Sequence, residues 1–132
     1  VLIGSQELIK RALRVRKVLG GGMRQVGYLA ACGIYALENN ISRLSDDHQK
    51  ALEIESTLKK LSFINKVETV ETNIIIFEID SKISSELFLK KMNDRDVKII
   101  SMGDNKLRIV THLNYTNVMH DKFLDILNNL EF

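Results

Sequence analysis

The hydrophobic pattern of this 132-residue chain changes its period at about residue 62, and that change limits the folds available to it. Before this point, apolar side chains recur every three to four residues, as they do along one face of a helix. After it, short runs rich in β-branched residues alternate with helical segments. We therefore expect three helices followed by a ββαββα unit, which is an α/β chain with an α+β C-terminal part.

Three helices are predicted in the first part of the chain, over residues 5–18, 23–37 and 42–61. Ser5 and Ser42 stand where N-caps are expected, because a serine hydroxyl can accept a hydrogen bond from a free N–H of the first helical turn. In the third helix, pairs of opposite charge four residues apart are expected on the solvent-exposed side. These pairs are Asp46–Lys50 and Glu55–Lys59.

The second predicted helix is apolar on nearly all sides between Val26 and Leu37, which requires burial against several neighbours. Residues 1–41 are therefore expected to need partners that the rest of this chain does not supply, either a further domain or a tight oligomer. Cys32, the single cysteine, lies in this helix and is interpreted as a small buried hydrophobe. Because it has no partner for an internal disulfide, a reducing compartment is expected.

The second part of the chain is predicted to form four strands and two helices. The strands are expected at 67–70, 74–79, 97–101 and 106–111, and the helices at 84–93 and 116–130. The turn residues Gly103-Asp104-Asn105 indicate a hairpin between the last two strands. Leu87, Phe88 and Met119 are expected to face the core.

Composition excludes several classes of function. Hydrophobic residues make up 45% of the chain and charged residues 27%, as in globular proteins, and no apolar run is long enough for a membrane span. A net charge of +2 offers no broad surface for nucleic acid. The basic residues between Lys10 and Lys17 are interpreted as the solvated face of the first helix.

Three consecutive glycines, Gly20, Gly21 and Gly22, stand between Lys17 and Arg24. Glycine allows close approach of another group, and a helix start offers unpaired N–H groups and partial positive charge. The run is a candidate cradle for an anion such as phosphate. A plain linker is the alternative that the residues alone leave open.

The amino-acid sequences of two segments resemble one family of enzymes. RKVLGGGMRQVGYLAACGIYAL, residues 16–37, and RIVTHL, residues 108–113, are similar to segments of the low-specificity threonine aldolases. These are pyridoxal-phosphate (PLP) enzymes of the fold type I, aminotransferase-like superfamily. Nearly the whole chain can be aligned with the C-terminal part of these enzymes. The lysine that forms the Schiff base with PLP in this family would then lie upstream of Val1. The resemblance thus implies a C-terminal fragment with no catalytic residue of its own.

The resemblance also implies a role for each part of the chain. Residues 1–41 would end the large PLP-binding domain, and residues 42–132 would form the small C-terminal domain. Arg24 would approach the cofactor phosphate of a neighbouring subunit, together with Lys17 and the glycine run. Arg108 would pair with the α-carboxylate of the substrate, although strand alternation alone favours an ordinary exposed position for it.

The family further implies a cytoplasmic homotetramer that cleaves β-hydroxy-α-amino acids, threonine or allo-threonine, to glycine and an aldehyde. Another fold type I PLP lyase or an amino-acid racemase remains an alternative. A non-enzymatic α+β binding module is a third possibility, and it predicts a monomer that ignores PLP.

The remaining polar residues are given structural roles. His112 is expected at a strand end, His48 at a packed or edge position, and His120 in solvent. Asn73 is interpreted as a turn residue that bonds the local backbone. No histidine, cysteine or acidic residues have metal-ligand spacing, so no metal site is expected.

Overall fold

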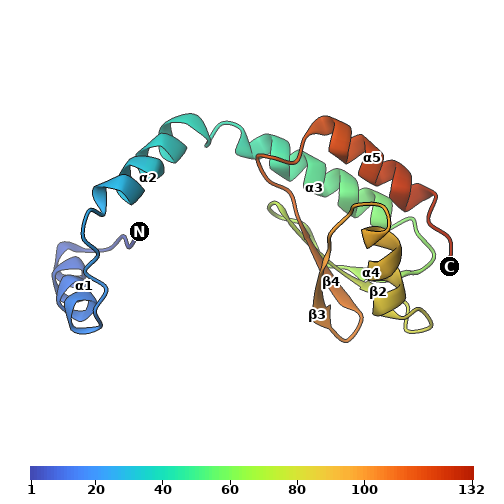
Figure 1. The fold of residues 1–132 in the computed structure, drawn as a ribbon, viewed down its shortest axis with the longest axis horizontal. Coiled ribbons are helices and arrows are strands. Elements are labelled where there is room, and N and C mark those ends of the chain that lie inside the picture. The colour runs from blue at the N-terminus through green and yellow to red at the C-terminus, as the bar shows by residue number, and fades with distance from the viewer. The chain divides into compact units, whose positions relative to one another are not determined.

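The computed structural model describes residues 1–132, which form two compact units (Figure 1). The first unit is Val1–Ile41 and contains the helices α1 (Gln6–Val18) and α2 (Gly27–Asn39). The second unit is Ser42–Phe132 and contains three helices and all four strands.

Helix α1 agrees with the prediction, and the Ser5 hydroxyl accepts a hydrogen bond from the Leu8 N–H at 3.4 Å. Helix α2 begins at Gly27, four residues later than predicted. The residues before it form a turn in which Gln25 has a φ of 50°. A left-handed residue cannot continue a right-handed helix, so the glycine run does not lead directly into α2.

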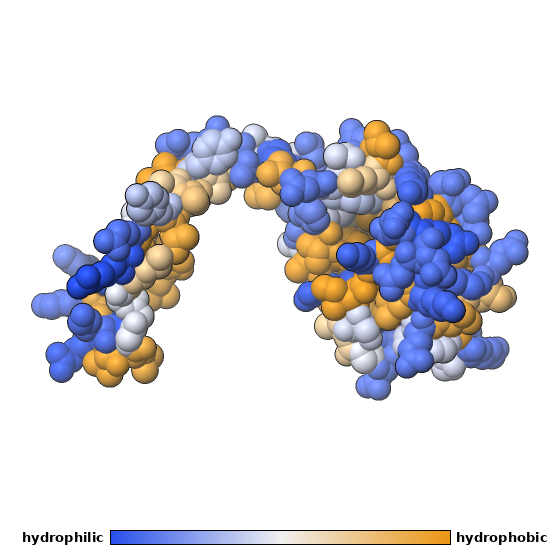
Figure 2. All heavy atoms as spheres, in the orientation of Figure 1, coloured by the Kyte–Doolittle hydropathy of each residue, from blue (hydrophilic) through white to orange (hydrophobic).

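No residue of α1 or α2 is buried within the first unit. Figure 2 shows apolar atoms at the surface of this unit, where Tyr28, Leu29 and Leu37 are exposed. Cys32 is exposed as well, so the prediction of a buried thiol is wrong for this chain. The cause is that the neighbours that an apolar helix requires are not among these 41 residues.

The second unit is a layer of helices on a four-stranded antiparallel sheet with strand order β1-β2-β4-β3. Its elements are α3 (Leu44–Leu58), β1 (Ile64–Val67), β2 (Ile74–Ile79), α4 (Ser85–Asn93), β3 (Ile100–Gly103), β4 (Lys106–Val110) and α5 (Asn117–Asn128). The predicted α/β class and the order of elements are confirmed. The hairpin turn is also confirmed, since Asp104 and Asn105 both have positive φ.

One face of this sheet forms the core. Ile75, Phe77 and Ile79 of β2 are buried, whereas the residues between them are not. Helix α4 contacts the same face through Phe88, whose ring lies 6.0 Å from that of Phe77. Further core residues come from α3, β4 and α5, among them Ile54, Leu58, Leu107, Phe123 and Leu127. All three helices thus cover one face.

Two element boundaries differ from the prediction for physical reasons. Strand β1 covers Ile64–Val67, three residues earlier than expected, because Val70 is buried in the core outside the ladder and its N–H donates to Glu55. Helix α3 starts at Leu44, and the Ser42 side chain does not cap it. The Ser42 carbonyl instead accepts a hydrogen bond from the Ser45 hydroxyl at 3.1 Å.

Several predicted side-chain positions were also wrong. Lys50 does not pair with Asp46, because its amine donates to the Tyr115 carbonyl at 2.7 Å. Glu55 does pair with Lys59 at 2.8 Å, but its side chain is largely buried. Leu87 and Met119 are exposed rather than in the core.

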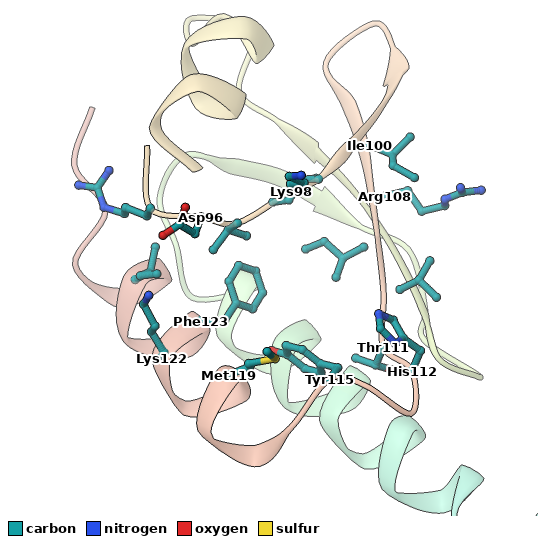
Figure 3. A pocket seen from close by; sticks show the side chains of 16 residues that line it. Asp96, Lys98, Ile100, Arg108, Thr111, His112, Tyr115, Met119, Lys122 and Phe123 are labelled. Carbon is teal, nitrogen blue, oxygen red and sulfur yellow. The ribbon is translucent and has the colours of Figure 1, made fainter. Parts of the chain in front are cut away.

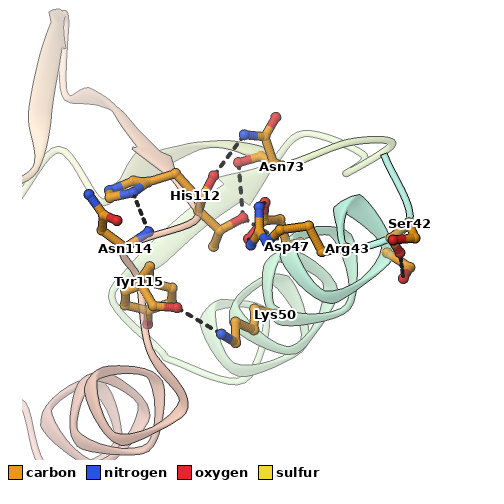
Figure 4. A network of polar contacts seen from close by, with 10 residues as sticks. Ser42, Arg43, Asp47, Lys50, Asn73, His112, Asn114 and Tyr115 are labelled. Carbon is orange, nitrogen blue, oxygen red and sulfur yellow. Dashed lines mark hydrogen bonds and ion pairs between the residues drawn. The ribbon is translucent and has the colours of Figure 1, made fainter. Parts of the chain in front are cut away.

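A polar junction joins the start of α3 to the sheet (Figure 4). Thr111, which is 0% exposed, donates its hydroxyl hydrogen to the Asp47 carbonyl at 2.7 Å. The Asn73 side-chain amide donates to the Thr111 carbonyl at 2.7 Å, so the expectation of local bonding for Asn73 was wrong. The Asp47 carboxylate accepts two hydrogen bonds from Arg43, at 2.7 and 2.9 Å. Every buried polar group of the junction therefore has a partner.

A second polar cluster links α3 to α5 through His120, which is 4% exposed. The prediction that His120 is solvated is thus wrong. Its Nε2 lies 2.8 Å from Glu53 Oε2, and its Nδ1 lies 3.2 Å from the Tyr115 hydroxyl. Because a carboxylate only accepts hydrogen bonds, Nε2 of the His120 ring is the donor in the contact with Glu53. Burial raises the pKa of Tyr115, which keeps that hydroxyl a donor.

We predict that Thr111→Val destabilises the second unit by about 1–2 kcal/mol, because it removes the buried hydrogen bond from the Thr111 hydroxyl to the Asp47 carbonyl of α3. The measurement is urea unfolding followed by circular dichroism. Thr111→Ser is the matched control, because it retains the hydroxyl and loses only a methyl group. A larger loss for serine than for valine would show that methyl packing matters more than the hydrogen bond.

Acid should weaken the Glu53 contact. The hydrogen bond from Gln49, and then that from His120, hold the pKa of Glu53 below its ordinary value of 4.5. A carboxyl whose pKa is lower in the folded state stabilises the fold above its unfolded pKa, and this contribution is lost as pH falls through the folded pKa. The stability difference between the wild type and Glu53→Gln should therefore shrink from about pH 6 to about pH 3.

The measurement for Glu53 is urea unfolding at both pH values. Glu71→Gln is the control, because Glu71 is exposed and makes no hydrogen bond or ion pair. A stability difference that is the same at both pH values for Glu53→Gln would contradict the proposed linkage.

Candidate functional site

Arg108 lies at the centre of the sheet face that the helices of the second unit leave open. Its position in β4 is paired with Ile76 of β2 on one side and with Ile100 of β3 on the other. Leu107 points into the core and is fully buried, so the alternation of the strand places Arg108 on the opposite face. The alternation expected for this strand therefore holds, but Arg108 is half-buried rather than at an ordinary exposed position.

The Arg108 side chain has an unused hydrogen-bond donor. Its Nε is buried and has no hydrogen-bond partner within the chain. A buried N–H without a partner is costly, and in native structures such a group calls for an explanation such as a ligand. The guanidinium also makes no ion pair within 4.0 Å. A planar anion such as a carboxylate could accept hydrogen bonds from this fork and satisfy it.

A cavity of about 480 Å³ lies beside this position, between α5 and the strands β3 and β4. Apolar side chains line its centre, among them Ile109 of β4 and Phe123 of α5. Phe123 points into the cavity from α5 (Figure 3). Arg108 lies at the edge of this cavity, and its guanidinium extends away from the centre. The open sheet face and the cavity centre are therefore two different environments.

His112 follows β4 and is exposed. Its Nδ1 accepts a hydrogen bond from the Asn114 N–H at 3.2 Å, which supports a structural role at the strand end (Figure 4). His48 is half-buried, in agreement with the prediction of a packed or edge position.

The glycine run closes the C-terminal end of α1. Gly20 has a φ of 75°, and its N–H donates to the Lys17 carbonyl at 3.2 Å. The Gly21 N–H donates to the Arg16 carbonyl at 2.8 Å. These two bonds and the left-handed glycine form a Schellman motif. A Cβ on Gly21 would lie 3.1 Å from Arg16 Cγ and 3.3 Å from the Arg16 carbonyl oxygen, so a larger residue there would crowd the last turn of α1.

This cap decides which groups near the run remain able to bind an anion. The N–H groups of Gly20 and Gly21 are used within the chain, whereas the Gly22 N–H makes no hydrogen bond there. A Cβ on Gly22 would meet only Lys17 Cδ, at 3.9 Å. Lys17 and Arg24 are exposed and form no ion pair. Lys17, Gly22 and Arg24 are thus the free donors of this segment.

The predicted site residues lie in two different units. Lys17, the glycines and Arg24 belong to the first unit, and Arg108 belongs to the second. Two further features were not predicted from the sequence, namely the Arg43–Asp47 pair and the buried hydroxyl of Thr111, which hold the end of β4. The spacing of four residues between Arg43 and Asp47 was a detectable sign, but the contact of Thr111 with α3 spans 64 residues and was not.

No helix has the length and apolar character needed to cross a membrane. No three histidine, cysteine, aspartate or glutamate side chains come together as metal ligands would.

Comparison with known proteins identifies relatives over most of this chain. It is 39% identical over 121 residues to the probable low-specificity L-threonine aldolase 2 of Arabidopsis thaliana, covering 89% of this chain and 34% of that protein. It is 37% identical over 115 residues to the low specificity L-threonine aldolase of Escherichia coli K12, covering 86% of this chain and 32% of that protein. The chain thus spans about a third of the length of these relatives, and the resemblance seen in its sequence is confirmed.

A solved structure shares the fold. A C-DES mutant with glycine covalently linked to its PLP cofactor superimposes with a TM-score of 0.60 at 15% identity, over 80% of this chain and 28% of that protein. Finally, a family model described as beta-eliminating lyase matches residues 1–82, which is more than half of the chain. This chain therefore belongs to the beta-eliminating lyase family.

Proposed function

We propose that this chain is the C-terminal part of a PLP-dependent threonine aldolase, which cleaves β-hydroxy-α-amino acids to glycine and an aldehyde. The observation that carries the proposal is Arg108, whose buried Nε lacks a partner on an open sheet face. The identity of 37–39% to low-specificity threonine aldolases supports it. Threonine and allo-threonine are the proposed substrates.

In this proposal the two units belong to two domains of a longer protein. Residues 1–41 end the large PLP-binding domain, whose remainder would bury the apolar surface of α2. Residues 42–132 form the small C-terminal domain. We further propose that the complete protein is a cytoplasmic homotetramer, in which a subunit interface would cover part of the same apolar surface.

Arg108 is proposed to bind the α-carboxylate of the substrate. The guanidinium fork offers parallel N–H donors that fit the two oxygens of a planar carboxylate and so fix its orientation. The neighbouring side chains of Ile76 and Ile100 lower the local dielectric constant, which strengthens this contact relative to one in water. Both ladders of β4 hold the backbone of Arg108 in place.

The first unit is proposed to contribute to the phosphate site of PLP. When bound, PLP supplies an electron sink for cleavage of the bond next to the amino-acid α-carbon. The residues present fit a phosphate, because Arg24 and Lys17 are unpaired cations and the Gly22 N–H is a free donor. Gly20 and Gly21 would contribute by holding the backbone of this segment in place rather than by donating.

The direct test is to supply the complete protein with PLP and threonine and to measure glycine and acetaldehyde. Equal amounts of both products would support aldol cleavage. Ammonia release or a change in the stereochemistry of an amino acid, without aldehyde, would instead favour the alternative lyase or racemase.

In the complete protein, we predict that Arg108→Ala weakens productive capture of threonine by about 2–4 kcal/mol, because the carboxylate loses its charged partner. PLP binding, followed by the cofactor's absorbance, should be unchanged. Arg108→Lys should restore only part of kcat/KM, because an ammonium group cannot form two parallel hydrogen bonds. An unchanged kcat/KM in Arg108→Ala would contradict the carboxylate assignment.

We predict that Arg24→Ala raises the PLP dissociation constant and reduces the stabilisation that PLP gives to the oligomer, because ligand binding and assembly are linked. PLP titration and analytical ultracentrifugation measure the two effects. Gly22→Ala should also weaken PLP binding but leave the cofactor-free protein as stable as the wild type.

Gly20→Ala separates these effects from helix capping. It should destabilise the cofactor-free protein by about 1 kcal/mol, because alanine disfavours positive φ. Equal PLP affinity in the wild type, Arg24→Ala and Gly22→Ala would mean that the glycine run only caps α1.

A further inference from the structure

The apolar centre of the cavity in the second unit, away from Arg108 at its edge, has no role in the proposed reaction. This centre lies between α5 and the segment Val97–Ile99, which precedes β3 (Figure 3). Val97, Ile99 and Ile109 are only half-buried there, although they pack against the core. Met119 and Phe123 of α5 line the opposite side. The cavity is therefore an apolar slot, which differs from the open face that carries Arg108.

The slot exists because one segment stays outside the sheet. Sequence alternation predicted a strand from residue 97, but the ladder with β4 begins only at Ile100. Asp96, directly before the segment, has a φ of 61° and turns the chain away from α4. Val97–Ile99 thus lies beside α5 without backbone pairing to the sheet, and its side chains leave the space between them unfilled.

The rim of the slot is cationic. Lys98 from the segment and Lys122 from α5 both line it and are exposed. Neither amine has a carboxylate within 4.0 Å. Arg95 and Arg108 add further positive charge, although the Arg108 guanidinium extends away from the cavity centre, and Asp96 is the one acidic residue of the lining. An apolar centre with an excess of unpaired positive charge at its edge complements a molecule with an apolar chain and an anionic end.

We propose that this slot binds a small amphipathic carboxylate with a straight alkyl chain. The alkyl chain lies among Ile99, Ile109 and Phe123, and the carboxylate lies at the rim near Lys98 and Lys122. Burial of the alkyl chain provides the affinity, and the lysines select an anion over a neutral or cationic head group. The inference does not depend on the aldolase proposal, since the glycine run lies in the other unit and the Arg108 guanidinium, at the edge of the cavity, extends away from its centre (Figure 3).

The test uses the complete protein with isotope-labelled isoleucine and methionine methyl groups and sodium octanoate as the probe. Octanoate should shift the methyl resonances of Ile99 and Met119 in a saturable manner. Butanoate should bind at least about tenfold more weakly, because each buried methylene contributes about fourfold in affinity and butanoate has four fewer. Octylammonium, which has the same chain and the opposite charge, should bind at least about tenfold more weakly as well.

Variants separate this site from non-specific binding. The double reversal Lys98→Glu with Lys122→Glu should weaken octanoate binding by about tenfold or more. The control Lys60→Glu with Lys82→Glu changes the net charge equally at two exposed lysines outside the slot and should leave binding unchanged. Met119→Trp, at an exposed position, should block the slot without a loss of folding.

Three results would overturn the proposal. They are the absence of saturable shifts at Ile99 and Met119, equal binding of octanoate and octylammonium, and an unchanged affinity in the Lys98 and Lys122 double variant. Binding of an apolar peptide in place of octanoate would also reject the proposed ligand class. None of these outcomes depends on turnover of threonine, so they leave the aldolase proposal untouched.

Discussion

The structure of the second unit depends on the strict alternation of side chains along β2 and β4. Ile75, Phe77 and Leu107 enter the core, where three helices cover them, and the residues between them must then face the other way. A slip of one residue between these strands would place Arg108 in the core and expose leucine. The free energy of core burial therefore also fixes the orientation of the residue to which we assign substrate recognition.

The polar junctions complete this arrangement where apolar packing ends. Thr111 and Asn73 extend the contact between β4 and β2 beyond the last ladder pair, and Asp47 connects it to α3. The contact between His120 and Glu53 likewise connects α5 to α3. Such buried polar groups contribute little net stability each, but they strongly disfavour other packings, because any shift leaves them without partners.

The class of fold, the order of elements and the orientation of Arg108 could be predicted from the sequence, because they follow from local periodicity. The boundaries of β1 and β3 could not, since Val70 and Val97 are apolar for reasons of core packing rather than strand pairing. His120 was misplaced because the Glu53 that contacts it lies 67 positions away in the chain. The burial of Cys32 was wrongly predicted, because it requires neighbours around α2 that residues 1–41 do not supply.

A run of three glycines is usually taken as the most flexible part of a chain, but here the cap of α1 changes that expectation. The hydrogen bonds of Gly20 and Gly21 to the last turn restrict the backbone that a phosphate would meet. An anion that binds beside Gly20 and Gly21 would thus not have to immobilise them, because their backbone conformational entropy is already lost when α1 forms. Anion binding at this segment would then depend on the stability of the α1 cap, and not on the flexibility of a loop.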